Sequence, residues 1–291
     1  MYFESMIDNN LTYSIDMLRL TTLMSYSKFS EIEFRFETVW QEYIKKKYNS
    51  SRFVDFQYNY NIEIEEGVSF WFGFLHNAEK RSESDTALYN FTVEFNPNKL
   101  KMNKVLLYVL YSSADWKIKS FDLAVDIPVN ILDILGFEKG RRKDIKIFSS
   151  GFDNKTVYIG KTDNRIKIYN KKIESKLEIE GELTRLEISK KFDDFSLKRL
   201  FCYNFDDVFP DLYLNNYLYT FKDYEDKTLF AILYAVQNDF PFDNLSRRYK
   251  QKIKDLLKGG QKIKFSCKVS ADILRKVLYH YFIQPNSPVR L

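Results

Sequence analysis

The sequence predicts an α+β protein, with an antiparallel-sheet domain followed by a mainly helical region. Segments in the first two-thirds of the 291-residue chain alternate apolar and polar side chains with the period of two that is typical of strands. From about residue 196 onward, apolar residues recur at helical spacing instead. This change of period divides the chain into a domain at 1–195 and a C-terminal region at 196–291.

Strand-like segments and one helix make up the predicted domain at 1–195. A strand at 11–21 is followed by a helix at 27–49, where the last turn is basic. A short apolar run at 104–113 is compatible with a strand or a helix. Further strands are expected at 54–65, 68–76, 87–97, 117–129, 145–153, 155–172 and 181–189.

Two of these strands resemble each other. SIDMLRL at 14–20 and SFDLAVD at 120–126 both begin with Ser-x-Asp and continue with apolar residues. Two related halves placed around one cleft would explain the likeness. The matching segment is short and no repeat period supports it, so a chance likeness between two strands is the alternative.

The C-terminal region is predicted to be helical. Gly259-Gly260 would end one of its helices, and Ser270 or Asp272 would cap the last one. A short wing strand is expected at 261–270, so the region suits a winged-helix-like DNA-binding module or, equally, a helical cap on the first domain. The helical segments are 196–209, 225–237, 244–260 and 270–282.

Positive charge is concentrated in the same region. Residues 241–291 hold twelve Lys and Arg against three Asp and Glu, whereas the rest of the chain holds 33 against 37. Lys and Arg bind DNA by releasing counterions from its phosphates, which indicates a DNA-docking segment. A solvated basic helix face would have the same composition. The candidate DNA-binding residues here are Arg247, Arg248, Lys250 and Lys252.

Composition excludes several classes of protein. With 45% hydrophobic and 17% aromatic residues, the chain does not read as disordered. No run of about 18 apolar residues occurs and the N-terminus lacks a signal pattern, so we expect a cytoplasmic protein without a membrane partner. Cys202 and Cys267 are too few for a disulfide framework or a four-ligand zinc site and are expected to be reduced core thiols.

Three strands each present one apolar face and one face that bears charge, because side chains alternate between the two faces of a strand. If the apolar faces share one core, we expect the other faces to line one cleft. The side chains on those faces are Asp122, Asp126, Arg165, Lys167, Tyr169, Lys171, Arg185 and Glu187.

Such a set of side chains has a use in phosphate chemistry. Clustered carboxylates hold hard cations such as Mg²⁺ or Mn²⁺, which polarise a phosphate, while Lys or Arg offsets charge in the transition state. A tyrosine oxygen can attack phosphorus and form a covalent intermediate. Each residue taken alone is better explained by a half-exposed sheet, and Tyr169 is one of 21 tyrosines.

Taken in order, the segments SFDLAVDI, VYIGKTDNRIKIYNKKIE and GELTRLEIS resemble the replication initiation factor family. That family includes rolling-circle plasmid initiators of Gram-positive bacteria and related relaxases of integrative elements. The resemblance covers about residues 115–195, and its most specific part is Tyr-Asn-Lys-Lys-x-x-Glu. Two positions depart from the pattern: Lys167 stands where Arg is expected, and Lys161 where Ser is expected.

The resemblance implies that Tyr169 is the nucleophile and becomes linked to a 5′ phosphate. Lys171 and Arg185 would contact the phosphate. The implied ligands of Mg²⁺ or Mn²⁺ are Asp122, Asp126, Glu187 and Glu174. A metal site built on a pair of histidines around one apolar residue is excluded, because the chain has only His76 and His280.

By the same resemblance, the chain would initiate rolling-circle replication. It would bind double-stranded and single-stranded DNA at an origin, nick one strand in the domain at 1–195 and leave a 3′-OH for the host polymerase. A host helicase and a homodimer on two half-sites are the expected partners. Two alternatives stay open: a conjugative relaxase with the same chemistry, and an origin-binding regulator that does not cut.

Overall fold

The computed structural model describes residues 6–8, 10–47, 60–66, 68–74, 88–100, 103–137, 145–149, 155–160, 164–175, 180–206, 208–214, 228, 231–232, 244–258 and 261–282. The helices are α1 (Tyr26–Thr38), η1 (Gln41–Tyr43), α2 (Lys104–Leu110), η3 (Ile131–Asp133), α3 (Lys171–Ser175), α4 (Leu197–Leu200), α6 (Arg247–Lys258) and α7 (Cys267–Phe282). The strands are β1 (Met6–Asp8), β2 (Leu11–Ser25), β3 (Ile44–Lys47), β4 (Tyr60–Glu65), β5 (Val68–Phe74), β6 (Leu88–Phe95), β7 (Lys117–Ile127), β8 (Ile134–Phe137), β9 (Ile145–Ser149), β10 (Lys155–Ile159), β11 (Asn164–Asn170), β12 (Thr184–Ser196), β13 (Asp211–Leu214) and β14 (Gln261–Lys262).

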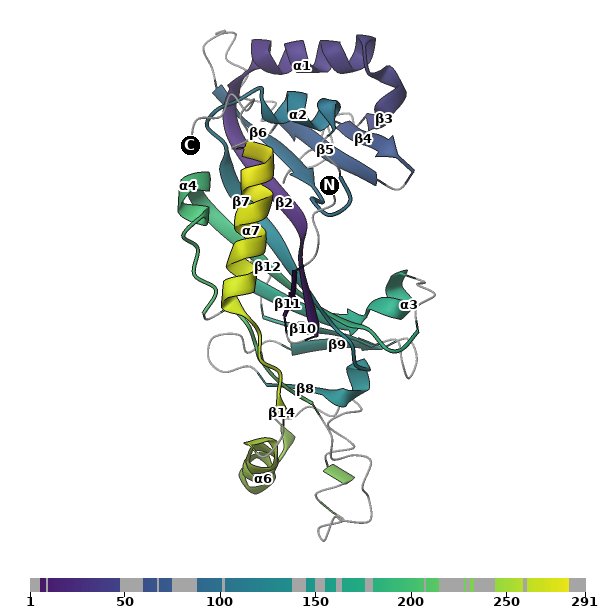
Figure 1. Cartoon of the computed structure of the whole chain (residues 1–291), viewed down its shortest axis with the longest axis vertical. Helices are drawn as coiled ribbons and strands as arrows, with labels where there is room; N and C mark the ends of the chain where they lie inside the picture. The colour runs from purple at the N-terminus through teal and green to yellow at the C-terminus, as the bar shows by residue number, and fades with distance from the viewer. Residues whose placement is uncertain are drawn as a thin grey trace.

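One antiparallel sheet dominates the fold (Figure 1). Among the described residues it has eleven strands, ten of them in the order β3-β4-β5-β6-β2-β7-β12-β11-β10-β9, and β1 pairs with β2 outside this path. A second sheet has the order β14-β13-β8. The α+β class with a large antiparallel sheet is thus confirmed.

The main sheet is built from two halves of the same strand order. In the first half, β2 lies beside β6, the last strand of that half, and β5 and β4 follow outward. In the second half, β7 lies beside β12, and β11 and β10 follow outward. The two first strands, which carry SIDMLRL and SFDLAVD, pair with each other at the centre. The halves therefore continue one sheet side by side, instead of facing each other as two sheets across a cleft.

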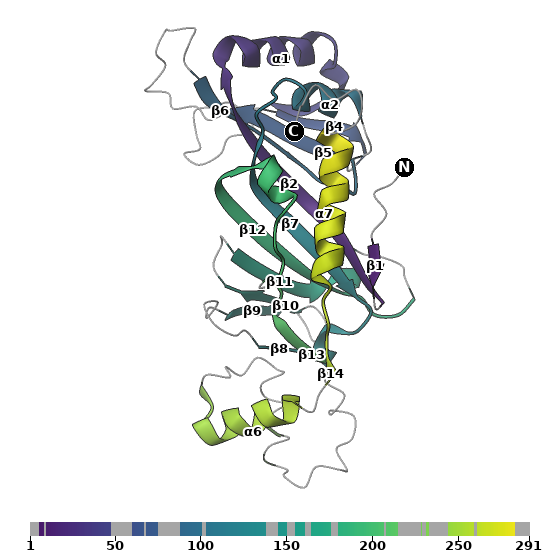
Figure 2. The ribbon, with the colours of Figure 1, turned by 60° about the vertical axis from the view of Figure 1, so that its left-hand side comes forward.

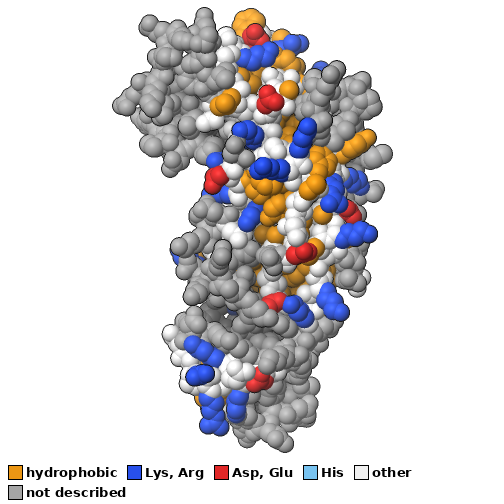
Figure 3. Space-filling view, turned by 90° about the vertical axis from the view of Figure 1, so that its left-hand side faces the viewer, with side chains coloured by type: hydrophobic (Ala, Val, Ile, Leu, Met, Phe, Trp, Pro, Cys, Tyr) orange, Lys and Arg blue, Asp and Glu red, His pale blue; other side chains and the backbone are white. Residues whose placement is uncertain are grey.

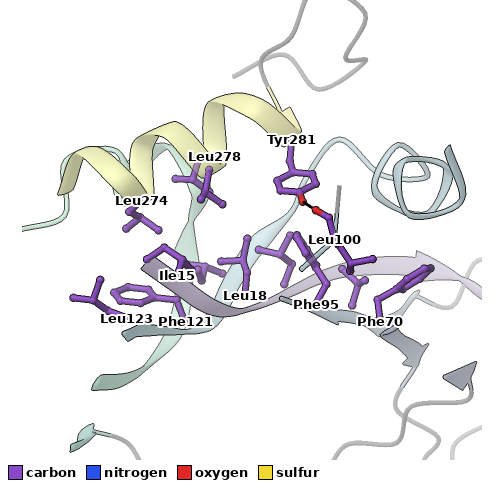
Figure 4. Close-up of a cluster of buried hydrophobic side chains, with 14 of the residues drawn as sticks. Ile15, Leu18, Phe70, Phe95, Leu100, Phe121, Leu123, Leu274, Leu278 and Tyr281 are labelled. Carbon is purple, nitrogen blue, oxygen red and sulfur yellow. Dashed lines mark hydrogen bonds between the residues drawn. The ribbon is translucent and has the colours of Figure 1, made fainter. Parts of the chain in front are cut away.

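Helices cover the apolar face of this sheet. On α7, Leu274, Leu278 and Tyr281 point at buried side chains of the central strands, as Figure 4 shows. The Tyr281 hydroxyl donates to the Leu100 carbonyl at 2.8 Å, and its ring packs against that of Phe95. Burial of these side chains supplies most of the driving force that holds α7 on the sheet.

The first long helix is shorter than its sequence pattern predicts. Ser25 caps α1 by accepting from the Lys28 amide, and the helix ends at Thr38 instead of continuing to residue 49. Trp40 still packs against Phe36 at 5.2 Å between ring centroids, which explains the apolar spacing beyond the helix. The basic residues 45–47 belong to β3, which pairs with β4.

The C-terminal region does not form one separate helical unit. α7 belongs to the core of the main sheet, and β13, which also pairs with β14, pairs with β8 from the first domain. The boundary near residue 195 therefore does not separate two packing units, and the helical-cap alternative is correct for α7 (Figure 2).

Two local predictions in this region are also wrong. α7 begins at Cys267, where the Val269 amide donates to the Ser266 hydroxyl at 3.2 Å, so Ser266 caps the helix and Ser270 and Asp272 do not. The segment 196–209 forms only the short helix α4. Helix α6 is confirmed at 247–258, and most of the segment 225–237 lies outside the described residues.

Within the described part of the chain, no helix is long and apolar enough to cross a membrane. Both cysteines are free thiols. Cys202 is exposed, which differs from its expected place in the core.

Candidate active site

The strands of the second half carry a polar face opposite the helices. Directly paired residues of antiparallel strands share a face. One row across the sheet runs Thr12, Asp126, Arg185, Tyr169, Thr156 and Phe148. The next row runs Ser14, Ala124, Glu187, Lys167, Tyr158 and Lys146. A third holds Met17, Asp122, Ser189 and Arg165. We call this surface the polar face. It brings together the predicted side chains of the three strands except Lys171, which lies in the first turn of α3 and not on β11.

Tyr169 lies almost fully buried on the polar face, with 2% of its surface exposed. Its hydroxyl donates to a carboxylate oxygen of Glu187. The Lys167 ammonium lies 3.8 Å from the centre of the Tyr169 ring and 3.7 Å from the other Glu187 oxygen. Burial and the Glu187 charge raise the pKa of Tyr169 above its ordinary value. The phenol is therefore held neutral, with a proton acceptor already in place.

Arg185 is tied to two carboxylates and is not a free phosphate ligand. Its Nε and Nη2 atoms donate to the two oxygens of Asp126 at 2.6 and 2.7 Å. Its Nη1 donates to Asp16 at 2.6 Å. The Arg185 side chain is 13% exposed, and its guanidinium joins β12 to β7 and β2 across the centre of the sheet. These contacts tie together the three strands beside Tyr169, and the expected contact of Arg185 with the phosphate stays a prediction.

Asp16 is a site residue that the strand pattern misses. A β-bulge between Ile15 and Met17 adds one residue to β2. The strict alternation predicted for 11–21 therefore fails beyond Ile15, and Leu18 points into the core in place of Met17. Asp16 also accepts from the side-chain amide of Asn98 at 3.1 Å. The one signal in the sequence was the likeness of the two first strands, which aligns Asp16 with Asp122.

Of the carboxylates that the structure describes, Asp122 has the most perturbed pKa. Burial raises its pKa to about 6, and the charges of Glu187 and Glu94 act in the same direction. A hydrogen bond from Ser189 and the charge of Arg19 oppose this rise. Asp122 and Glu187 are diagonal neighbours on adjacent strands. Two anionic groups held this close favour a bound proton or cation between them.

The other two predicted metal ligands are already paired with cations. Asp126 accepts both hydrogen bonds of the Arg185 fork, and Glu174 on α3 pairs with Lys171 at 2.8 Å. Among the described residues, no group of three or more His, Cys, Asp or Glu side chains is arranged to hold a metal ion. The described part of the chain thus offers Asp122 and Glu187, which are enough for Mg²⁺ where substrate phosphates complete its shell.

Of the predicted DNA-binding residues, Lys167 lies on the polar face, and the other four lie apart from it on α6. Figures 1 and 2 show this helix at the end of the molecule opposite α1, beyond β8 and β14. Arg247 and Arg248 are exposed, and Lys250 and Lys252 are half-buried. In Figure 3, Lys and Arg side chains outnumber acidic ones on this side of the molecule and gather again at its lower end.

Comparisons with known proteins find similarity in structure but not in sequence families. No family model matches the sequence, and no curated protein matches it. The structure of a rolling circle replication initiator protein from Geobacillus stearothermophilus is similar, with 15% sequence identity and a TM-score of 0.35. The similarity covers 85% of this chain and 97% of that chain.

Proposed function

We propose that this protein nicks one strand of DNA through Tyr169 and thereby initiates rolling-circle replication. The observation that carries the proposal is the hydrogen bond between Tyr169 and Glu187 beside two lysines. A nucleophile that donates directly to a carboxylate has the arrangement that covalent catalysis requires. The sequence resemblance supplies the reaction class.

The reaction balances with Glu187 and solvent water. The Tyr169 phenol gives its proton to Glu187 while its oxygen bonds to phosphorus. The bond from phosphorus to the 3′ oxygen breaks, this oxygen takes a proton from solvent and leaves as a 3′ hydroxyl, and Glu187 then releases its proton to solvent. Lys167 and Lys171, whose ammonium groups lie 3.8 and 5.6 Å from the ring centre, offset the charge on the phosphate.

A DNA phosphate can reach the Tyr169 hydroxyl if the Lys167 side chain moves away from the ring. Lys167 covers the ring, and a cation–π contact of this kind stabilises by about 0.5–2 kcal/mol. A DNA phosphate is a stronger partner for an ammonium than an aromatic ring. We therefore propose that Lys167 leaves the ring for the phosphate and uncovers the phenol.

The proposal includes a divalent cation that Asp122 and Glu187 would hold. It would polarise the phosphate and stabilise the phenolate. Asp126 and Glu174 are left out because their cationic partners lie at 2.6 and 2.8 Å, whereas Lys167 lies at 3.7 Å from Glu187. Basic residues of α6 would bind the flanking duplex, and a host helicase and a homodimer stay predictions.

The experiment that tests the proposal is a search for a covalent adduct. Single-stranded oligonucleotides tiled across the DNA around the gene are incubated with the protein and Mg²⁺ or Mn²⁺. An adduct that survives denaturation should carry a 3′-end label and not a 5′-end label, and peptide mapping should place it on Tyr169.

A DNA-binding regulator that does not cut is the second candidate. The 2% exposure of Tyr169 is the observation in its favour. Sequence-specific retention of one tile without any adduct would establish it and reject the nicking proposal.

Replacing Asp122 with Asn should stabilise the protein. Because the folded chain raises the pKa of this carboxyl to about 6 from its ordinary value near 4, the folded state binds the proton more tightly than the unfolded state. Stability therefore falls as the pH rises between these values and is lower by roughly 3 kcal/mol above them. Asp122→Asn should melt higher than wild type at pH 8 and equally at pH 4, and Asp115→Asn at an exposed position should match wild type.

The same pair of proteins tests the cation. Mg²⁺ or Mn²⁺ should raise the melting temperature of the wild type at pH 8 when a non-cleavable oligonucleotide is present, because a ligand of the folded state stabilises it. Asp122→Asn should show no such rise. An equal rise in both proteins would place the cation elsewhere.

A further inference from the structure

Two aromatic rings stand on the outer strands of the polar face. Phe148 on β9 is 59% exposed, and it contacts Tyr158 on β10 edge-to-face, with ring centroids 5.6 Å apart. Thr156 pairs with Phe148 on one side and with Tyr169 on the other. The exposed ring therefore lies in the same cross-strand row as the proposed nucleophile, about 10 Å away at two strand spacings.

The neighbours of these rings are cationic. The Arg165 guanidinium lies over the Tyr158 ring, 5.0 Å from its centre. Lys146 and Lys167 pair with Tyr158 from the two adjacent strands. The described residues of β9, β10 and β11 include no Asp or Glu.

The exposed phenylalanine of α1 has a different setting. Phe34 is even more exposed, at 69%, but it lies on α1 beside Glu31, Glu33 and Glu37. An exposed ring among acidic residues repels a nucleic acid, whereas rings among Lys and Arg stack its bases and bind its backbone. Single-stranded bases offer a free face to such rings, and paired bases do not.

We propose that Phe148, Tyr158 and Arg165 form a base-stacking platform for single-stranded DNA, with Lys146 as its phosphate contact. The platform would hold the bases next to the scissile phosphate and so present that phosphate to Tyr169. This inference rests on the proposed nicking function and names the form of DNA that the polar face binds.

Binding measured without cutting tests the platform. Tyr169→Phe protein is titrated with a fluorescent single-stranded oligonucleotide and, separately, with the same sequence as duplex. Adding Phe148→Ala should weaken single-strand binding about tenfold, since one base stacked on a ring contributes about 1–3 kcal/mol. Duplex binding should not change, and Phe148→Trp should retain single-strand affinity.

Salt dependence separates stacking from charge. Lys146→Gln should lower the slope of log affinity against log salt by about 0.7, while Phe148→Ala should leave this slope unchanged. Phe34→Ala is the matched control at an exposed aromatic residue of α1, and it should bind like the parent protein.

The outcomes distinguish the platform from the function on which it rests. Unchanged single-strand affinity in Phe148→Ala, together with a normal covalent adduct in wild type, overturns the platform alone. Equal weakening of duplex and single strand also overturns it, because stacking needs unpaired bases. Absence of both single-strand binding and the adduct overturns the platform and the nicking function together.

Discussion

Tyr169→Phe protein should nick origin DNA at least about 10³-fold more slowly than wild type and form no covalent adduct. The substitution removes one atom, the oxygen that would bond to phosphorus. The ring can keep its place, because it is 2% exposed and remains under the Lys167 ammonium. Glu187 loses one donor but keeps Lys167 at 3.7 Å, so the free energy of unfolding should fall by only about 1–2 kcal/mol.

Two further variants make this result specific. Tyr279→Phe, at an exposed tyrosine of α7, should nick like wild type. Glu187→Gln can still accept the phenol hydrogen bond but cannot take the proton, so it should nick about 10²–10⁴-fold more slowly while still forming the adduct. If Tyr169→Phe and wild type nick equally well, the nucleophile is another residue.

The two faces of the central strands follow from the sequence alone. Ile166, Ile168, Leu186 and Ile188 alternate with charged residues and Tyr169, and all four are buried. A period of two determines which side chains share a face, and the apolar face is the one that is buried in the core. This local rule predicts that Tyr169 and Glu187 share a face, and the pairing of β11 with β12 in the structure brings the two side chains together.

Contacts between distant segments could not be predicted in this way. Alternation within a strand does not order the strands, so the ties of Arg185 to Asp126 and Asp16 had no signature in the spacing of any one strand. Helix α7 reads from its sequence as an amphipathic helix, and periodicity does not say which apolar surface it covers. The resemblance implies four carboxylate ligands, and in the structure the cationic neighbours of Asp126 and Glu174 distinguish these two from Asp122.

Removing the Arg185 side chain should destabilise the protein more than any surface change. The side chains of Asp126 and Asp16 are only 17% and 20% exposed. In Arg185→Met, both would lose their shared cation. Loss of one partner of a buried ion pair lowers the free energy of unfolding by about 3–5 kcal/mol, because the remaining charge is left without compensation. Arg185→Lys keeps the charge but loses the fork that binds Asp126 through two atoms. Its free energy of unfolding should therefore lie between those of wild type and Arg185→Met. Denaturant unfolding measures these differences.

A surface pair of the same chemistry provides the control. Arg275 on α7 donates to Asp272 at 3.1 Å and is 47% exposed, so Arg275→Met should change stability by less than about 1 kcal/mol. In Arg185→Met, converting Asp16 and Asp126 to Asn should recover part of the lost stability, because the uncompensated charges are then gone. If Arg185→Met unfolds like Arg275→Met, the three residues do not act as an ion-pair network. Recovery of stability without recovery of nicking would show that this network also positions β12 and its Glu187 against Tyr169.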